Sequence, residues 1–268
     1  MATQPSIHVS LRDVTKVFES RLGPIQALGP LDLELRQGEL FAVVGPSGCG
    51  KSTLLDIIAA LASPSSGTVT FEGRPIASAV PDGVGVVFQE NACFPWLNVA
   101  DNITFGLHRQ PVEPAEIEQR LQYALQLMGL NDFARAFPAQ LSGGMRQRVC
   151  IARTLVMQPR LILLDEPFGA LDQQTRLLMG DELLRIWRAT GATVLLITHA
   201  LDEAAMLADR VAVMSARPGR IMEVIETGWP NDRDSRIVSA PEFGAITARL
   251  WTLLRTQSMH ALRPDPGR

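Results

Sequence analysis

A glycine-rich segment in the first fifth of the chain carries the most specific chemical pattern in the sequence. It reads Gly45-Pro-Ser-Gly-Cys-Gly-Lys51-Ser52 and matches the spacing GxxxxGK[ST]. Glycines in this spacing let backbone N–H groups turn inward around phosphate oxygens. The lysine supplies a compact charge for terminal phosphates, and the serine offers a hydroxyl to Mg²⁺. The sequence predicts a phosphate site made of Gly45, Pro46, Ser47, Gly48, Cys49, Gly50, Lys51, Ser52 and Thr53.

Two adjacent carboxylates, Asp165 and Glu166, follow the apolar segment Leu161–Leu164. Carboxylates are rarely placed after a buried strand without a partner. Asp165 is suited to hold Mg²⁺, directly or through water, and Glu166 to accept a proton from an attacking water or to orient it. Alone, the pair is equally compatible with a helix N-cap. Together with the phosphate loop it predicts a hydrolytic site.

The elements that must position these groups are predicted from apolar patterning. Four short segments are typical of buried strands, and each leads into polar or glycine-containing residues and then into helical patterning. This alternation predicts a mostly parallel sheet covered by helices, with ligands at the carboxyl ends of the strands. The four segments are Leu40–Val44, Val84–Phe88, Leu161–Leu164 and Thr193–Ile197, and a helix is predicted over Thr53–Ala62.

The flanking regions differ from this core. Alternating apolar and polar residues at Ile7–Val9, Val14–Phe18 and Leu31–Leu35 predict a small antiparallel sheet. Residues 96–158 are predicted to be mostly helical. A composition shift near Trp229 predicts a boundary between a domain at 1–228 and a helical extension at 229–268. In that extension Ser239 and Glu242 form a capping-box pattern, and the following apolar face comprises Ile246, Leu250, Leu253 and Leu254.

Composition excludes several classes of protein. The chain has 268 residues and a net charge of −3, which excludes a nucleic-acid binder that works by bulk positive charge. It has three cysteines without a CxxC pair, so neither a disulfide framework nor a zinc site is predicted, and a reducing compartment is indicated. Its only two lysines are Lys16 and Lys51. No apolar run approaches the roughly 18 residues of a spanning helix, so we expect a soluble chain whose membrane role comes through a partner.

A further segment narrows the class. Leu141-Ser-Gly-Gly-Met-Arg-Gln-Arg-Val149 resembles the LSGGQ signature of the ATP-binding cassette (ABC) ATPases, with Met145 in place of the glutamine. The resemblance extends over residues 7 to about 225. It implies a P-loop NTPase of α/β class with a mostly parallel core, an N-terminal antiparallel β-subdomain and an inserted α-helical subdomain. It also implies that Ser142, Gly143 and Gly144 contact ATP.

The other family elements follow in the same order. Gln89 resembles the Q-loop glutamine, Gly169-Ala-Leu-Asp172 the D-loop, and His199 the switch histidine. The resemblance implies catalytic roles for Glu166, His199, Lys51 and Gln89, and a Mg²⁺ site at Ser52, Gln89 and Asp165. Asp172 is implied to be near the nucleotide. Phe18 is the candidate for stacking on adenine, with a core position as the alternative.

One loop points to a partner. Phe94-Pro-Trp-Leu-Asn-Val99 places large apolar groups in a loop region, which indicates a protein contact, although packing of Trp96 inside the helical subdomain is the alternative. Together, Pro95–Asn102, Asp165–Asp172 and Ser215–Arg220 resemble the nitrate/sulfonate/taurine branch of bacterial importers.

The resemblance to that branch implies an ATP- and Mg²⁺-dependent motor. It would act as a homodimer of cassettes, held by polytopic permease subunits on the cytoplasmic side of the inner membrane and served indirectly by a periplasmic binding protein. Taurine, another sulfonate and nitrate all remain open as the solute. The rivals are an ABC ATPase acting on nucleic acid or ribosomes, which usually has tandem cassettes or coiled-coil insertions, and a soluble P-loop kinase.

Overall fold

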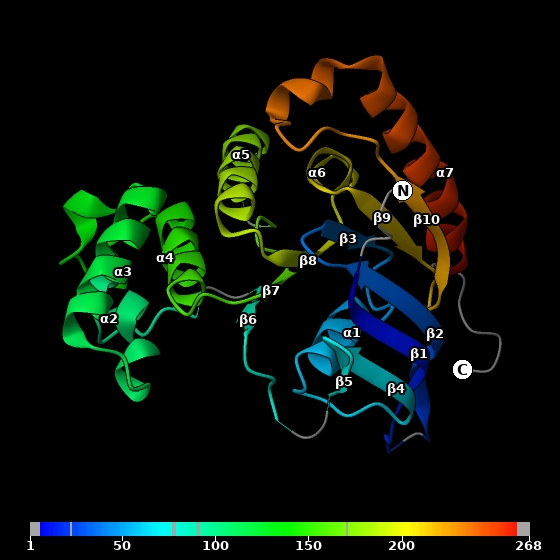
Figure 1. Cartoon of the computed structure of the whole chain (residues 1–268). Coiled ribbons are helices and arrows are strands. Elements are labelled where there is room, and N and C mark those ends of the chain that lie inside the picture. Colours follow the sequence, from blue (N-terminus) through cyan, green and yellow to red (C-terminus); the bar gives the residue numbers. More distant parts are fainter. Residues whose placement is uncertain (1–5, 22, 77–78, 90–91, 170, 262–268) are drawn as a thin grey trace.

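A six-stranded sheet forms the centre of the molecule (Figure 1). The structure is a computed structural model, and it describes residues 6–21, 23–76, 79–89, 92–169 and 171–261. The strand order is β10-β9-β3-β8-β7-β6, parallel throughout except for the antiparallel pairing of β10 with β9. The predicted α/β class with a mostly parallel core is therefore confirmed. The strands are β3 (Leu40–Val44), β6 (Val84–Val87), β7 (Leu161–Asp165), β8 (Thr193–Thr198), β9 (Arg210–Met214) and β10 (Ile221–Glu226).

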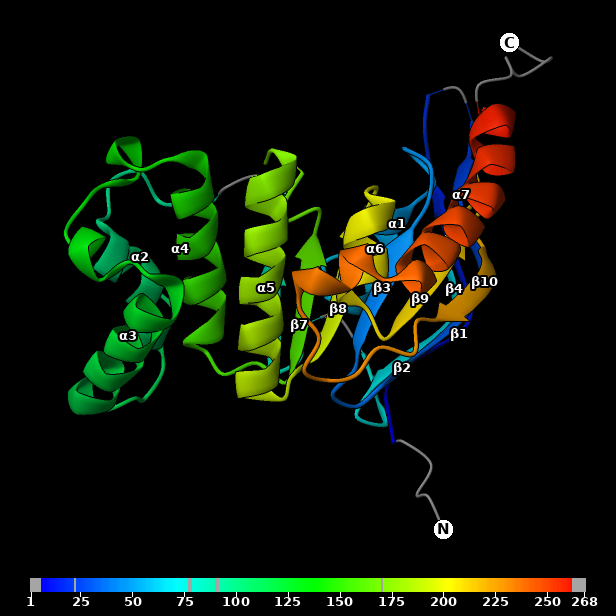
Figure 2. The ribbon, with the colours of Figure 1, turned by 90° about the horizontal axis from the view of Figure 1, so that it is seen from above.

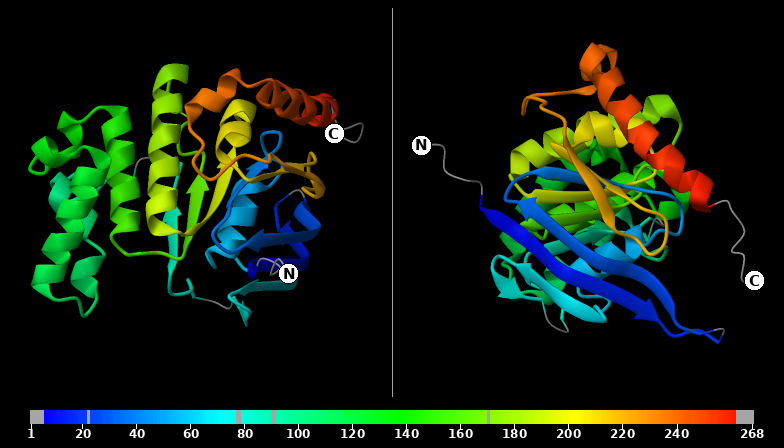
Figure 3. Two further views of the ribbon diagram at one scale, coloured as in Figure 1. Left: turned by 45° about the horizontal axis from the view of Figure 1, so that its top comes forward. Right: turned by 90° about the vertical axis from the view of Figure 1, so that its right-hand side faces the viewer.

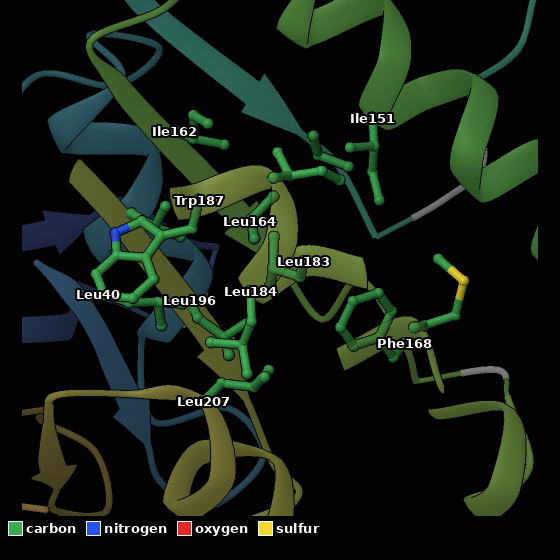
Figure 4. Close-up of a cluster of buried hydrophobic side chains, with 14 of the residues drawn as sticks. Leu40, Ile151, Ile162, Leu164, Phe168, Leu183, Leu184, Trp187, Leu196 and Leu207 are labelled. Atoms are coloured by element: carbon green, nitrogen blue, oxygen red, sulfur yellow. The ribbon is translucent and has the colours of Figure 1, made fainter. Parts of the chain in front are cut away.

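Burial on both faces explains why the central strands are continuously apolar. Alternate residues of β3 enter two different cores: Ala42 joins one and Phe41 joins the other. The first core lies against helices α5 (Gln173–Thr190) and α6 (Leu201–Leu207), and its centre includes Leu164, Leu196 and Trp187 (Figure 4). The second core lies against α1 (Lys51–Ile58) and the N-terminal sheet.

The N-terminal antiparallel sheet is larger than predicted. Its order is β2-β1-β4-β5, formed by the long strands β1 (Ile7–Phe18) and β2 (Ile25–Arg36) and by β4 (Ser66–Phe71) and β5 (Arg74–Pro75). Figure 3 shows this sheet as a layer beneath the central sheet. The sequence patterns did not indicate β4 and β5, which are short and mostly exposed on their outer side.

The predicted helical region projects from one edge of the central sheet (Figure 2). It packs as one layer beside α5, and its last helix begins at the Ser-Gly-Gly segment. Its elements are α2 (Val99–Thr104), η1 (Leu107–Arg109), α3 (Pro114–Met128), η2 (Asn131–Phe133), η3 (Pro138–Gln140) and α4 (Gly143–Leu155). Within it, the sulfur atoms of Cys93 and Cys150 lie 3.5 Å apart, and the three cysteines are free thiols.

The C-terminal segment folds back onto the central sheet. It contains η4 (Ser235–Ser239) and the long helix α7 (Pro241–Ala261), which contacts α6 and β9. Trp229 joins it to the core, because its indole Nε1 donates to the carbonyl of Ala205 at 2.6 Å. The predicted apolar face packs inward, with Leu250 and Leu254 buried. The division of the chain at Trp229 stays a prediction.

Three local expectations were wrong. The first helix ends at Ile58, before Ala62, because Ala60 takes a positive φ of 57° that a helix cannot continue through. The strand predicted to reach Phe88 ends at Val87. Ser239 does not cap α7, because the helix starts at Pro241 and the Ser239 hydroxyl donates to the carbonyl of Arg236 at 2.8 Å. Among the described residues, no helix is long and apolar enough to cross a membrane.

Candidate functional site

The phosphate loop joins β3 to α1, as the sequence predicted. Gly48 and Gly50 have φ values of 73° and 105°, which suit glycine, and Gly50 caps the helix. A β-carbon at Gly50 would lie 2.9 Å from the carbonyl oxygen of Ala27, so a larger residue has no room there. Lys51 is buried, and its Nζ donates to the carbonyls of Gly45 at 2.9 Å and Pro46 at 3.1 Å. The loop therefore presents backbone N–H groups and one ammonium group to the same space.

The acidic pair lies at the carboxyl end of β7. Asp165 is the last residue of the strand and is buried. Burial raises the pKa of its carboxyl group, a hydrogen bond from Ser52 lowers it, and the charges of Glu166 and Asp56 raise it further. Oδ1 of Asp165 has no hydrogen-bond partner among the described residues. A buried carboxylate oxygen without a partner, beside a serine hydroxyl, fits a hard cation such as Mg²⁺.

Glu166 connects the ends of three strands. Its Oε2 accepts a hydrogen bond from Nε2 of Gln89 at 3.1 Å and lies 3.0 Å from Nδ1 of His199. The backbone of Glu166 has a φ of 46°, and its N–H donates to the carbonyl of Ile197 at 2.8 Å. The left-handed conformation of a non-glycine residue is costly, and it turns the chain sharply after the strand. The structure thus brings together Gln89, Glu166 and His199, although Gln89 and His199 are 110 residues apart in the sequence.

A cavity of about 620 Å³ collects these groups. Its polar end includes Lys51, Ser52, Gln89, Glu166 and His199, and its apolar end has Phe18, Ile25 and Ala27. The remaining lining residues are Ser47, Gly48, Gly50, Thr53 and Arg217. The size and the gradient from polar to apolar match a small organic ligand with a charged end.

Phe18 is on the surface of this cavity and not in the core. Its side chain is 43 % exposed. The ammonium group of Lys16 lies 4.9 Å from the centre of the Phe18 ring and also donates to the carbonyl of Ser63 at 2.7 Å. Lys16 is therefore more than a solvated strand residue, because it supports the aromatic ring through a cation–π contact.

The remaining predicted residues lie elsewhere. Ser142, Gly143, Gly144 and Asp172 are not among the cavity-lining residues, and of the phosphate loop and the acidic pair the lining also leaves out Gly45, Pro46, Cys49 and Asp165. Ser142 caps α4, its Oγ accepting the N–H of Met145 at 3.3 Å. Asp172 caps α5, and the N–H of Thr175 is the main reason for the lowered pKa of its carboxyl group. Both segments therefore end at helix N-termini. Ala170 lies outside the described residues.

Two features of the site had no local sequence signal. Arg217 lines the cavity although it is in a turn far along the chain. Glu203 is buried close to the end of β8, next to the residues that flank His199. Its Oε2 accepts a hydrogen bond from the Thr198 hydroxyl at 2.8 Å, and that hydroxyl accepts the N–H of Ala200 at 3.0 Å. Arg217 belongs to the segment Ser215–Arg220 that resembles the importer branch, but that resemblance did not place it at the cavity, and Glu203 belongs to no motif.

Comparison with known families identifies the chain. Residues 28–169, which contain the phosphate loop and the acidic pair, match the family model described as ABC transporter. The chain belongs to this family. It is an ATP-binding cassette, with the ATPase activity of the family, and the expectation raised by the signature segment is confirmed.

Three import ATP-binding proteins are similar to this cassette over most of its length. A nitrate import ATP-binding protein of Synechocystis sp. is 40 % identical over 255 residues, which is 93 % of this chain and 96 % of that protein. A taurine import ATP-binding protein of Pelagibacter ubique is 44 % identical over 252 residues, covering 91 % and 93 %. An aliphatic sulfonates import ATP-binding protein of Bacillus cereus is 40 % identical over 234 residues, covering 87 % and 92 %.

A solved structure shares the fold of this cassette. It is a dimeric post-hydrolysis state of an ATP-binding cassette bound to ADP and Pi. It is 31 % identical to this chain with a TM-score of 0.73, over 83 % of this chain and 100 % of that one.

Proposed function

We propose that this chain is the ATP-hydrolysing motor subunit of a bacterial ABC importer for a small anion or sulfonate. The observation that carries the proposal is the convergence of Lys51, Ser52, Gln89, Glu166 and His199 on one cavity. The names of the similar proteins, which concern import of nitrate, taurine and aliphatic sulfonates, supply the transport direction and the solute class. They do not favour the alternative of an ATPase acting on nucleic acid or ribosomes.

In this proposal different residues of the chain have different roles in binding and hydrolysing ATP. Lys51 and His199 stabilise the charge of the γ-phosphate. Glu166 accepts a proton from the attacking water, and the hydrogen bond from Gln89 and the contact with His199 at its Oε2 orient the carboxylate for that task. Phe18 stacks on the adenine, and the ammonium group of Lys16 holds the Phe18 ring through a cation–π contact.

Ser52, Gln89 and Asp165 are the proposed ligands of Mg²⁺, directly or through water. The buried, unpartnered Oδ1 of Asp165 supports this assignment, because such an oxygen is costly to leave without a positive partner. When bound, the cation would supply charge neutralisation at the phosphates.

A second copy of the chain completes the proposed catalytic unit. Ser142, Gly143 and Gly144 lie outside the cavity lining, at the N-terminus of α4, where backbone N–H groups and the helix dipole attract anions. Head-to-tail packing of two cassettes would place this segment of one copy, with Asp172, against the ATP of the other. ATP would then close the dimer, and hydrolysis would release it.

The loop at residues 94–98 is the proposed contact with a polytopic permease. Trp96 is 70 % exposed, and Phe94 packs against it with ring centres 5.6 Å apart. Asn102 fixes this loop: its side chain accepts the N–H of Phe94 at 2.8 Å and donates to the carbonyl of Leu97 at 2.9 Å. A large, exposed aromatic side chain on an ordered loop is typical of a protein-binding anchor. The permease would hold the cassette on the cytoplasmic side of the inner membrane as a peripheral subunit, with a periplasmic binding protein acting indirectly.

The first test is whether a neighbouring reading frame encodes a polytopic permease, and the second is reconstitution of this chain with that permease. We expect the two to co-purify from detergent extracts. In proteoliposomes that hold the binding protein, we expect taurine, an alkanesulfonate or nitrate to stimulate ATP hydrolysis. A Trp96→Ala variant should lose co-purification while the isolated chain still binds ATP. Strong nucleic-acid binding without a permease would contradict the proposal.

A further inference from the structure

The turn between β9 and β10, residues 215–220, closes one end of the nucleotide cavity. Its Arg217 is a lining residue together with Phe18, Ile25 and Ala27. The turn is docked on β2: the N–H of Gly219 donates to the carbonyl of Ala27 at 2.9 Å, and the N–H of Gly29 donates to the carbonyl of Gly219 at 3.0 Å. Arg217 therefore belongs to the apolar end of the cavity, away from the acidic pair.

The turn is held rigidly from inside. The N–H of Ser215 donates to the carbonyl of Arg220 at 2.9 Å, and the Ser215 hydroxyl accepts the N–H of Arg220 at 3.1 Å. The same hydroxyl lies 3.1 Å from the carbonyl oxygen of Pro218. Helix α7 adds a contact from outside, because Oε1 of Gln257 accepts the N–H of Ala216 at 3.1 Å.

The turn is also packed directly against the phosphate loop. A β-carbon at Gly219 would lie 2.2 Å from the carbonyl oxygen of Cys49, so only glycine permits this approach. The backbone that carries Arg217 is consequently fixed with respect to Lys51 and Ser52, so binding a ligand has to order only the Arg217 side chain.

The guanidinium of Arg217 is free to bind. Within the described part of the chain it makes no ion pair or side-chain hydrogen bond. Lys51 and Arg217 are the two permanent cations in the cavity lining. Arg220, three residues further along the same turn, is also exposed but does not line the cavity.

We propose that Arg217 is a nucleotide-binding residue that contacts the base and ribose of ATP at the apolar end of the cavity. A planar guanidinium both stacks on an aromatic base and donates hydrogen bonds at its edge, which an ammonium group cannot do. Phe18 and Arg217 then recognise the base end, while Lys51 and Ser52 recognise the phosphates. This inference rests on the proposed binding of ATP in the cavity.

The test compares two ligands of the purified full-length chain by calorimetry: ATP, and tripolyphosphate, which has no base or ribose. For Arg217→Ala we expect the Kd of ATP to rise about tenfold, the loss of one stacked cationic contact, with the Kd of tripolyphosphate unchanged. Arg217→Lys should lie between the two, since it keeps the charge without the plane. Arg220→Ala is the matched control and should bind both ligands as the wild type does.

Two results would overturn the inference. An unchanged Kd of ATP in Arg217→Ala would exclude any contact, and an equal loss for ATP and tripolyphosphate would assign Arg217 to the phosphates. The Lys51→Ala variant separates this inference from the proposed function. It should bind both ATP and tripolyphosphate much more weakly, and if it binds both normally, then ATP does not bind in this cavity.

Discussion

Oε2 of Glu166 lies 3.0 Å from Nδ1 of His199. The contact joins the end of β7 to the end of β8 and leaves the other ring nitrogen, Nε2, available to a ligand. Gln89 donates to the same carboxylate oxygen, so the proposed base contacts both Gln89 and His199 at a single atom. A displacement of Gln89 or His199 would therefore change the position of the Glu166 carboxylate, which is proposed to receive the proton.

The first prediction concerns Glu166→Gln. The amide keeps the size and the hydrogen-bonding reach of the side chain but cannot accept a proton from water. We expect the turnover number to fall at least about 100-fold, the usual contribution of a general base, while ATP binding persists. Turnover and nucleotide occupancy should be measured on the same preparation. Glu118→Gln, an exposed glutamate on α3, is the control, and near-normal turnover of Glu166→Gln would remove Glu166 from the role of base.

Asp165→Asn tests the cation site. The substitution removes the charge of a buried carboxylate that has an unpartnered oxygen, so the variant should need much more Mg²⁺ for half-maximal hydrolysis. Folding should be preserved or improved, because burial already disfavours the charged form and raises the pKa of this group. The Mg²⁺ dependence of ATPase activity and the urea midpoint give the two readouts. The assignment fails if the Mg²⁺ requirement is unchanged.

The pH dependence of stability has a specific contributor in Glu203. Burial raises the pKa of its carboxyl group from 4.5 to about 7, against the lowering effects of the Thr198 hydrogen bond and of Arg176. The folded state then holds a proton that the unfolded state has lost, so stability falls as the pH rises from about 4.5 to about 7.

Replacing Glu203 by Gln should remove this decline. The variant should resemble the wild type near pH 4.5 and exceed its free energy of unfolding by about 3 kcal/mol above pH 7. Denaturant unfolding at pH 5 and pH 8 measures both values. An identical pH slope in variant and wild type would show that Glu203 does not titrate in this range.

Asn102 should control the loop at residues 94–98. Its fully buried side chain makes four hydrogen bonds to the backbone, with Phe94 N–H and with the carbonyls of Phe94, Leu97 and Asn98. Asn102→Ala leaves these groups unsatisfied and should lower stability by about 2 to 3 kcal/mol. Hydrogen exchange at the amide of Phe94 should rise as well. The exposed Asn131→Ala should change neither quantity, and the prediction is wrong if both variants behave alike.

The carboxyl ends of the strands were predictable because local patterns define them. Leu40–Val44 and Leu161–Leu164 are unbroken apolar runs, and the groups that follow them, Lys51 and Glu166, lie at one edge of a parallel sheet by topology alone. The motif order placed Gln89 and His199 at the same edge.

What the sequence could not indicate depends on contacts between distant segments. The position of Arg217 follows from the hydrogen bonds of Gly219 with Ala27 and Gly29, which lie about 190 residues earlier in the chain. Strand β10 pairs only with β9 at the edge of the sheet, so half of its residues stay partly exposed and its apolar pattern is weak. The buried Glu203 is different: its partner Thr198 is only five residues away, but a glutamate on a helix carries no motif or periodic signal of burial.

The support of Phe18 by Lys16 has a practical consequence. The chain has only two lysines: Lys51 lines the cavity from the phosphate loop, and Lys16 contacts the ring of the lining residue Phe18. Incorporation of isotope-labelled lysine during expression would therefore give side-chain NMR signals from two residues, one at the phosphate end and one at the base end of a single site. Spectra of so sparse a label could follow the occupancy of each end separately, even within a large membrane complex.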